Sequence, residues 1–126
     1  MKITTNFDAD EFGQALTAQG MQNYYLLCLL VLEKIRNRFG VVQITSGFRN
    51  EIENKRVGGS PTSQHLWAEA VDFVCPYAQS MGEVFRFILD DLQWPGETIW
   101  YKRRGHVHVS LPHIGVKADQ YIDGTK

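Results

Sequence analysis

Metal-binding side chains recur in this sequence at a spacing that suits catalysis. His65 and Asp72 stand seven residues apart, and His106 and His108 follow near the end of the chain. Two of these three imidazoles and the carboxylate can serve as ligands to one metal. A catalytic zinc site uses three protein ligands of this kind and leaves the fourth position to water, whereas a structural site closes with four ligands, usually including cysteines. The pattern predicts the open metal site of a small hydrolase.

The composition excludes some classes of protein. Positive and negative side chains nearly balance, with 13 Lys and Arg against 14 Asp and Glu in 126 residues. The chain therefore lacks the basic surface of a nucleic-acid-binding protein. A chain of this length can bury a core as one domain. We expect one monomeric domain over residues 1–126, with a core at about 7–111 and a polar, irregular tail at 112–126.

Neither the cysteines nor the apolar segments indicate a special compartment. Cys28 and Cys75 lack the close spacing of a metal knuckle or a redox pair, so we interpret both as buried thiols. The N-terminus has no apolar stretch of signal-peptide length, and the strongest apolar run, 24–32, is too short to span a bilayer. We expect a soluble chain made in the cytoplasm, without membrane insertion, that needs another route to act outside the membrane.

Three segments have helical patterns. Residues 8–18 read as a short helix opened by an Asp cap, and residues 80–92 as an amphipathic helix. Residues 21–39 read as the core helix, which Gly40 ends. The apolar stripe expected on this core helix consists of Leu26, Leu29, Leu30, Leu32 and Ile35.

Four segments read as strands. They are residues 41–45, 68–74, 97–101 and 106–111, of which the last two form a pair joined by residues 102–105. Residues 46–50 are turn-prone, and the loop at 57–61 leads the chain to His65. The sequence thus predicts an α+β fold, in which a small antiparallel sheet carries the site and packs against two or three helices.

The alternation of side chains along the last predicted strand determines which histidines can reach the metal site. His106, His108 and Ser110 share one face of that strand, while the intervening apolar residues share the other. Both histidines can therefore reach the site. A single histidine on a strand is more often a hydrogen-bonded surface or core group than a ligand, and Asp72 alone could cap or pair. It is the joint arrangement that favours the metal.

Several motifs also resemble a known family. They are the segments 44–50, 57–60, 63–65 and 106–110, together with Ala70, Asp72 and 99–101. They resemble the zinc D-Ala-D-Ala carboxypeptidase family of peptidoglycan peptidases, and above all its short single-domain members from phages and bacteria. The resemblance runs from about Phe7 to Leu111.

The resemblance implies a function and a set of roles. It implies a zinc metallopeptidase that hydrolyses peptide bonds in peptidoglycan stem peptides, as a carboxypeptidase or an endolysin-like endopeptidase acting at the cell wall. His65, Asp72 and His108 would bind one Zn²⁺ per chain. Arg49 would bind substrate or stabilise the transition state, and Ser63 would lie near the substrate.

The chemistry of peptide hydrolysis suits these roles. Zinc lowers the pKa of a bound water to about 7, and an arginine fork can clamp an oxyanion or a terminal carboxylate. Arg49 fits that second requirement, although the alternative is a surface arginine in a turn. For Ser63 the alternative is a serine that caps or stabilises a loop.

One expected group is missing. Many family members carry a Glu three residues before the last zinc histidine, or an Asp just before the His-x-His pair, as general base. Both alignments fall on Gly105 here. His106 is our first candidate for the base, because its strand face already points to the site. Glu69 and Glu97 are the alternatives, and both are expected to be solvated carboxylates.

Other readings of the motifs are weaker. A cupin places further metal ligands well downstream of its His-x-His pair, but only 18 residues follow His108. A two-histidine phosphoesterase needs His-x-Ser or His-x-Thr twice, and Leu66 and Trp67 after His65 exclude the second copy. The serious alternative is a catalytically impaired, zinc-bound domain that binds the cell wall or serves as a virion or adaptor component.

Overall fold

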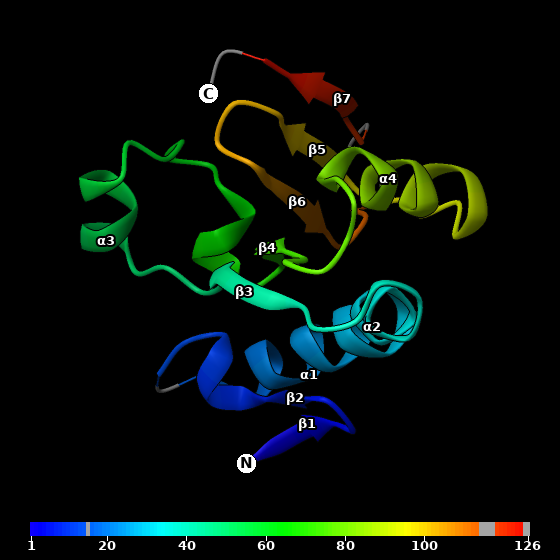
Figure 1. Cartoon of the computed structure of the whole chain (residues 1–126). Helices are drawn as coiled ribbons and strands as arrows, with labels where there is room; N and C mark the ends of the chain where they lie inside the picture. Colours follow the sequence, from blue (N-terminus) through cyan, green and yellow to red (C-terminus); the bar gives the residue numbers. More distant parts are fainter. Residues whose placement is uncertain (15, 114–117, 125–126) are drawn as a thin grey trace.

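A mixed five-stranded sheet forms the centre of the fold (Figure 1). The computed structural model describes residues 1–14, 16–113 and 118–124. The strand order is β3, β4, β6, β5 and β7, and all neighbours are antiparallel except β5 and β7. The α+β prediction is confirmed. The strands of this sheet are β3 Gln43–Ser46, β4 Ala70–Val74, β5 Thr98–Tyr101, β6 His106–Ser110 and β7 Gln120–Asp123; β1 Lys2–Thr4 and β2 Phe7–Asp8 form a separate hairpin.

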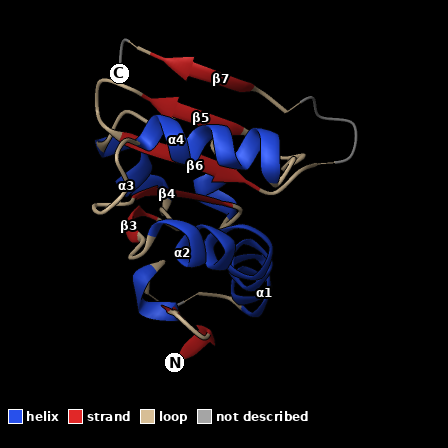
Figure 2. Ribbon diagram, turned by 45° about the vertical axis from the view of Figure 1, so that its right-hand side comes forward, coloured by secondary structure: helices blue, strands red, loops and turns tan. Residues whose placement is uncertain are grey.

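The helices lie mainly on one face of the sheet. Figure 2 shows α2 and α4 in front of the strands, with α3 on the opposite side. Inward side chains of the strands, Val71, Phe73, Val107 and Val109, join the buried core against these helices. The helical segments are α1 Ala18–Leu27, η2 Cys28–Leu32, α2 Glu33–Phe39, α3 Glu51–Arg56, α4 Met81–Arg86 and η4 Phe87–Asp91, with the 3₁₀ turns η1 Ala9–Glu11 and η3 Gln64–Trp67.

The core helix is confirmed in its extent but not in its buried face. α1, η2 and α2 form one continuous run, which the Thr17 hydroxyl caps and which Gly40 ends at a φ of 84°. Leu29 and Leu30, assigned to the core stripe, are 45% and 43% exposed. Because the run is apolar all round, its composition could not select the inward face. The buried hydrophobic residues of this run are Tyr24, Leu27, Cys28, Val31, Leu32 and Ile35.

The predicted helix at 8–18 is wrong. Asp8 does cap a helical turn, and Glu11 completes a capping box, but this turn is a 3₁₀ segment of only three residues. Gly13 then takes a φ of 136°, which leaves the helical region. The segment instead delivers Phe12 to the core, where its ring stacks on Tyr24 with the ring centres 4.6 Å apart. Residue 15 of the predicted helix lies outside the described residues.

The tail was predicted to be irregular, and this is wrong for Gln120–Asp123. These residues form β7, a parallel edge strand beside β5. The side-chain amide of Gln120 donates to the Trp94 carbonyl at 2.8 Å, and the backbone amide of Thr98 donates to the Asp119 carbonyl at 2.9 Å. An exposed edge strand needs no apolar alternation, so this composition gave no strand signal. Residues 114–117 and 125–126 of the tail lie outside the described part.

The other predicted strands, the predicted helix at 80–92 and the predicted buried cysteines agree with the structure. Strands 41–45, 68–74, 97–101 and 106–111 correspond to β3, β4, β5 and β6 within about two residues, and helix 80–92 corresponds to α4 and η4. Both cysteines are free and buried, and burial raises each thiol pKa to about 12. Among the described residues, no helix combines the length and the apolarity that crossing a bilayer requires.

Candidate metal centre

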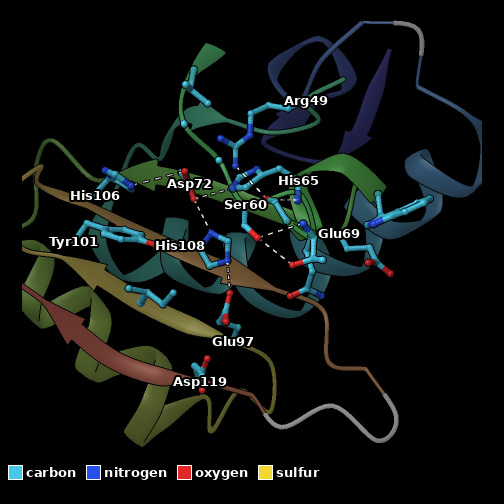
Figure 3. A pocket seen from close by; sticks show the side chains of 18 of the residues that line it. Arg49, Ser60, His65, Glu69, Asp72, Glu97, Tyr101, His106, His108 and Asp119 are labelled. Carbon is cyan, nitrogen blue, oxygen red and sulfur yellow. Dashed lines mark hydrogen bonds and ion pairs between the residues drawn. The ribbon is translucent and has the colours of Figure 1, made fainter. Parts of the chain in front are cut away.

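Three ligand-type side chains meet on the face of the sheet opposite the helices (Figure 3). One oxygen of Asp72, Oδ1, lies 3.2 Å from His65 Nε2 and 2.8 Å from His108 Nδ1. His65 is only 2% exposed and His108 only 7%. The structure therefore brings together the three residues that the sequence predicted as metal ligands, in a site screened from bulk water.

Strand pairing and a short helical turn position these side chains. Asp72 on β4 and His108 on β6 are direct cross-strand partners, so their side chains emerge side by side. His65 lies on η3, and the Ser63 hydroxyl caps this turn by accepting from the His65 amide at 3.2 Å. Ala68, in the left-handed region at a φ of 55°, ends the turn and redirects the chain into β4.

The outer nitrogens of both histidines face protein oxygens. His65 Nδ1 lies 2.7 Å from the Gly47 carbonyl, to which its N–H donates, so the lone pair of Nε2 is free for a metal. His108 Nε2 lies 3.0 Å from Glu97 Oε1. Backbone carbonyls and carboxylates are the usual outer partners of metal-binding histidines.

The donor set fits a zinc ion. Zinc binds imidazole nitrogen and carboxylate oxygen at about 2.0–2.2 Å, which places neighbouring tetrahedral ligand atoms about 3.3–3.5 Å apart. The observed separations of 3.2 Å and 2.8 Å from Asp72 Oδ1 are somewhat shorter than this range. All three ligand atoms lie within 4.8 Å of one another, so a small outward shift of the side chains would admit the ion.

The same contacts set the charge states of the metal-free site. Burial opposes ionisation of Asp72, but its contacts with His108 and His65 outweigh this effect, and the Asp72 pKa lies far below its ordinary value. Burial likewise lowers the His108 pKa, yet its contacts with Asp72 and Glu97 prevail and raise that pKa to about 9. Without a metal, His108 and Asp72 form a buried ion pair.

His106 lies beside the group rather than within it. Its Nε2 is 3.7 Å from the second oxygen of Asp72, Oδ2, and its ring packs against Tyr101 with the ring centres 4.9 Å apart. Burial lowers the His106 pKa below its ordinary value. His106 is therefore a neutral imidazole near pH 7, able to accept a proton.

Arg49 and Ser63 are neighbours in the structure. The guanidinium Nη2 of Arg49 donates to the Ser63 hydroxyl at 3.3 Å, while the Arg49 amide donates to the carbonyl of His65 at 3.0 Å. Arg49 Nε is buried and has no hydrogen-bond partner among the described residues. Ser63 thus combines the capping role with a contact to Arg49, and Arg49 retains an unused donor.

A helix that the sequence reading missed supports Arg49. α3 begins after Asn50, whose side chain caps it, and its buried Asn54 packs under the following loop. A Cβ on Gly59 would lie 2.2 Å from Asn54 Oδ1 and 3.2 Å from Arg49 Nη1, so only glycine fits there. The Asn cap before Glu51 was the signal that could have revealed this helix.

These residues line one cavity of about 870 Å³ on the open face of the sheet. Figure 3 shows Arg49 on one side of the His and Asp group and Tyr101 on another. Cavities of this size accept ligands the size of a short peptide. Besides the residues already described, the lining includes Ser60, Thr62, Trp67, Ile99, Arg104, Asp119 and Tyr121.

Comparison with known proteins identifies the family. The sequence profile of Peptidase M15 matches residues 5–110, which is most of the 126-residue chain. The chain belongs to the Peptidase M15 family. This confirms the resemblance to zinc D-Ala-D-Ala carboxypeptidases, and M15 peptidases are zinc enzymes. No curated protein matches the chain.

Gly105, where the resemblance would place a general-base carboxylate, lies in a turn that favours glycine. Gly105 closes the turn between β5 and β6 at a φ of 87°, and its amide donates to the Tyr101 carbonyl at 2.8 Å. A side chain at this position would strain the backbone, although a Cβ there would meet no atom within 4 Å. The turn, rather than a lack of space, favours glycine.

The expectation that Glu69 and Glu97 are solvated is wrong. The Glu69 side chain is 18% exposed, and its Oε1 lies 2.8 Å from His113 Nε2 at the rim of the M15 cavity. The Glu97 side chain is 28% exposed and faces His108. Both carboxylates are held in place by histidines, so neither moves freely toward the metal position.

Proposed function

We propose that this chain is a zinc-dependent peptidase that hydrolyses peptide bonds of bacterial peptidoglycan stem peptides, as a D-Ala-D-Ala carboxypeptidase or an endolysin-like endopeptidase. The observation that carries the proposal is the convergence of both buried imidazoles on one oxygen of Asp72. Arg49, with its unused buried donor, lines the same cavity. Membership of the M15 family supports peptidase chemistry.

Each part of the reaction has a group in this cavity. His65 Nε2, Asp72 Oδ1 and His108 Nδ1 would hold Zn²⁺. Bound zinc lowers the pKa of a coordinated water to about 7 and polarises the scissile carbonyl. His65 and His108 remain fixed during turnover because their outer nitrogens face the Gly47 carbonyl and the Glu97 carboxylate.

Arg49 and His106 supply the remaining chemistry. The Arg49 fork donates to the developing oxyanion or to the terminal carboxylate of a stem peptide. Ser63 orients this fork through the contact with Nη2. Neutral His106, beside Asp72 Oδ2, accepts the proton of the attacking water and passes it to the leaving amine.

Digestion of purified peptidoglycan tests the proposal. The zinc-loaded protein should release new peptide termini, and mass spectrometry of these termini identifies the bond that is cut. A His65→Ala, His108→Ala double variant is the control and should release none. Gly105, which replaces the usual carboxylate, favours one alternative: a domain that binds wall fragments without cutting them. Binding without any cleavage by the unmodified protein would select that alternative.

A further inference from the structure

Glu97 contacts the side of His108 that faces away from the metal position. Its Oε1 lies 3.0 Å from His108 Nε2, while the other ring nitrogen, Nδ1, lies 2.8 Å from Asp72 Oδ1. His108 Nε2 is fully buried, and no aligned hydrogen bond reaches it from the described residues. A buried N–H without an acceptor destabilises the folded protein. The adjacent carboxylate is the acceptor that this nitrogen requires.

The hairpin places Glu97 there by register. Ile99 on β5 pairs with His108 on β6, and the Ser110 amide donates to the Glu97 carbonyl at 3.0 Å, so Glu97 stands opposite Ser110. Side chains two residues apart share a face of a strand, which makes Glu97 and His108 diagonal neighbours on the site face. Their contact follows from the strand pairing and needs no loop movement.

The backbone before Glu97 is also fixed. The Trp94 indole N–H donates to the Ser110 carbonyl at 2.8 Å, directly above Gly96. A Cβ on Gly96 would overlap both that carbonyl and the indole nitrogen, so glycine is required for the approach. The Gln120 amide donates to the carbonyls of Trp94 and Gly96 at 2.8 and 3.3 Å. Glu97 therefore projects from a rigid position.

We propose that Glu97 is a positioning residue, which holds His108 as a metal ligand by accepting a hydrogen bond from Nε2. The inference rests on the proposed function. When a metal occupies Nδ1, Nε2 must carry the proton, and a carboxylate acceptor fixes both the tautomer and the ring orientation. The same geometry argues against Glu97 as general base, because its carboxylate lies across the His108 ring from the metal position.

Zinc affinity measures this role without reference to turnover. Competition with a chromophoric chelator gives the zinc dissociation constant of the full-length protein and its variants. Glu97→Ala should weaken zinc binding by about 10–100-fold, the usual loss when an outer partner of a metal-binding histidine is removed. Glu97→Gln keeps an acceptor but loses the charge, so its zinc affinity should fall by a smaller factor, about three- to tenfold. Glu83→Gln removes an exposed carboxylate on α4 and should bind as the unmodified protein does.

A spectroscopic readout separates positioning from general destabilisation. With Co²⁺ in place of zinc, the visible absorption spectrum reports the ligand geometry. In the zinc-loaded protein, the ¹⁵N chemical shifts of His108 report its tautomer. The unmodified protein and the Glu97→Gln variant should have the same cobalt absorption spectrum. In both proteins the ¹⁵N shifts should place the His108 proton on Nε2. The spectrum should change in the Glu97→Ala variant, with circular dichroism confirming that it is folded. If Glu97→Ala does not fold, a zinc affinity in Glu97→Gln equal to that of the unmodified protein overturns the inference.

The two proposals fail in different ways. A protein that binds one zinc but cuts no wall peptide disproves the peptidase function, and the zinc affinities still decide the role of Glu97. Equal zinc affinity in the unmodified protein and a folded Glu97→Ala variant overturns the positioning role and leaves the peptidase proposal intact.

Discussion

Asp72 is the residue on which the site is built. Its oxygen Oδ1 contacts His65 Nε2 and His108 Nδ1, and its oxygen Oδ2 lies 3.7 Å from His106 Nε2. One buried carboxylate thus divides the histidines into two classes. His65 and His108 contact the oxygen on the metal side, whereas His106 stands by the other oxygen, where a proton acceptor is needed.

Removal of any ligand should abolish stoichiometric zinc binding. Three protein ligands are the minimum for a catalytic site, so Asp72→Ala should leave well under one zinc per chain by elemental analysis. His113→Ala is the matched control, because His113 pairs with Glu69 at the rim of the cavity and should leave the zinc content unchanged. Full zinc occupancy in the His65→Ala, His108→Ala double variant would refute the ligand assignment.

Arg49 should affect turnover and not metal binding. Arg49→Lys keeps the positive charge but loses the planar fork and its buried Nε donor, so kcat/KM should fall by about tenfold or more. Zinc content and the thermal midpoint should stay unchanged. Arg56→Lys is the control, because Arg56 is an exposed arginine paired with Glu53. Equal activity of the Arg49 variant and the unmodified protein would return Arg49 to a surface role.

His106 tests the identity of the general base. His106→Ala leaves three metal ligands, so zinc should remain while turnover falls by about a hundredfold or more. Gly105→Asp in the same variant should restore part of the rate, at a cost of about 1 kcal/mol for a side chain at positive φ. Loss of zinc from His106→Ala would instead make His106 a ligand, and an unchanged rate would assign the proton transfer to another group.

Local patterns together with the family resemblance were sufficient to predict the ligands but not their outer partners. His65 and Asp72 are close in sequence, and strand alternation placed His106 and His108 on one face. Glu97 was expected to be solvated because its role depends on the register of the hairpin. The four-residue turn pairs Tyr101 with His106, and from that register the position of Glu97 beside His108 follows.

At the scale of elements, the loop after α3 packs against Arg49. Gly58 takes a φ of 74°, and Gly59 packs against Asn54 and the Arg49 guanidinium. The sequence identified this segment as a loop, since paired glycines mark turns. The reason for the second glycine is a tertiary contact, which no local pattern reveals. The same limit explains the missed edge strand β7, which hydrogen bonds to β5 hold in place.

The two glycines should respond differently to alanine. Gly59→Ala forces a Cβ against Asn54 and Arg49, so the loop must shift and kcat/KM should fall by about tenfold or more. Gly58→Ala strains the backbone by about 1 kcal/mol but meets no atom within 4 Å, so it should lower the thermal midpoint with little effect on turnover. Peptidase assays and thermal melts of both variants give the kcat/KM and the thermal midpoint of each. Equal kinetic effects would show that Gly59 does not support Arg49.

At the scale of the whole molecule, the sheet separates stability from chemistry. The helix-covered face holds the apolar core, and the opposite face carries the ionisable groups, with His108 and Asp72 buried as an ion pair in the metal-free protein. A buried pair of this kind couples folding to pH, because the folded and unfolded chains bind protons with different affinities. Metal binding must act on the same coupling, since zinc displaces the proton of an imidazole.

The fall in stability with rising pH should therefore be cancelled when zinc binds. Burial lowers the His108 pKa, but its contacts with Asp72 and Glu97 raise it from 6.5 to about 9. In the metal-free protein, protonated His108 stabilises the fold through these contacts. This stabilisation is full below pH 6.5 and is lost as the pH rises through about 9, so the thermal midpoint should fall over that interval. Zinc binds only the ring whose Nδ1 is unprotonated, so the stabilisation that zinc adds should grow over the same interval.

Differential scanning calorimetry with zinc and with a chelator should show the gap between the two midpoints widening with pH. Asp72→Asn removes the carboxylate that raises the His108 pKa, so its metal-free melts should depend less on pH. A gap that stays constant from pH 6.5 to 9 would show that His108 does not exchange its proton for the metal.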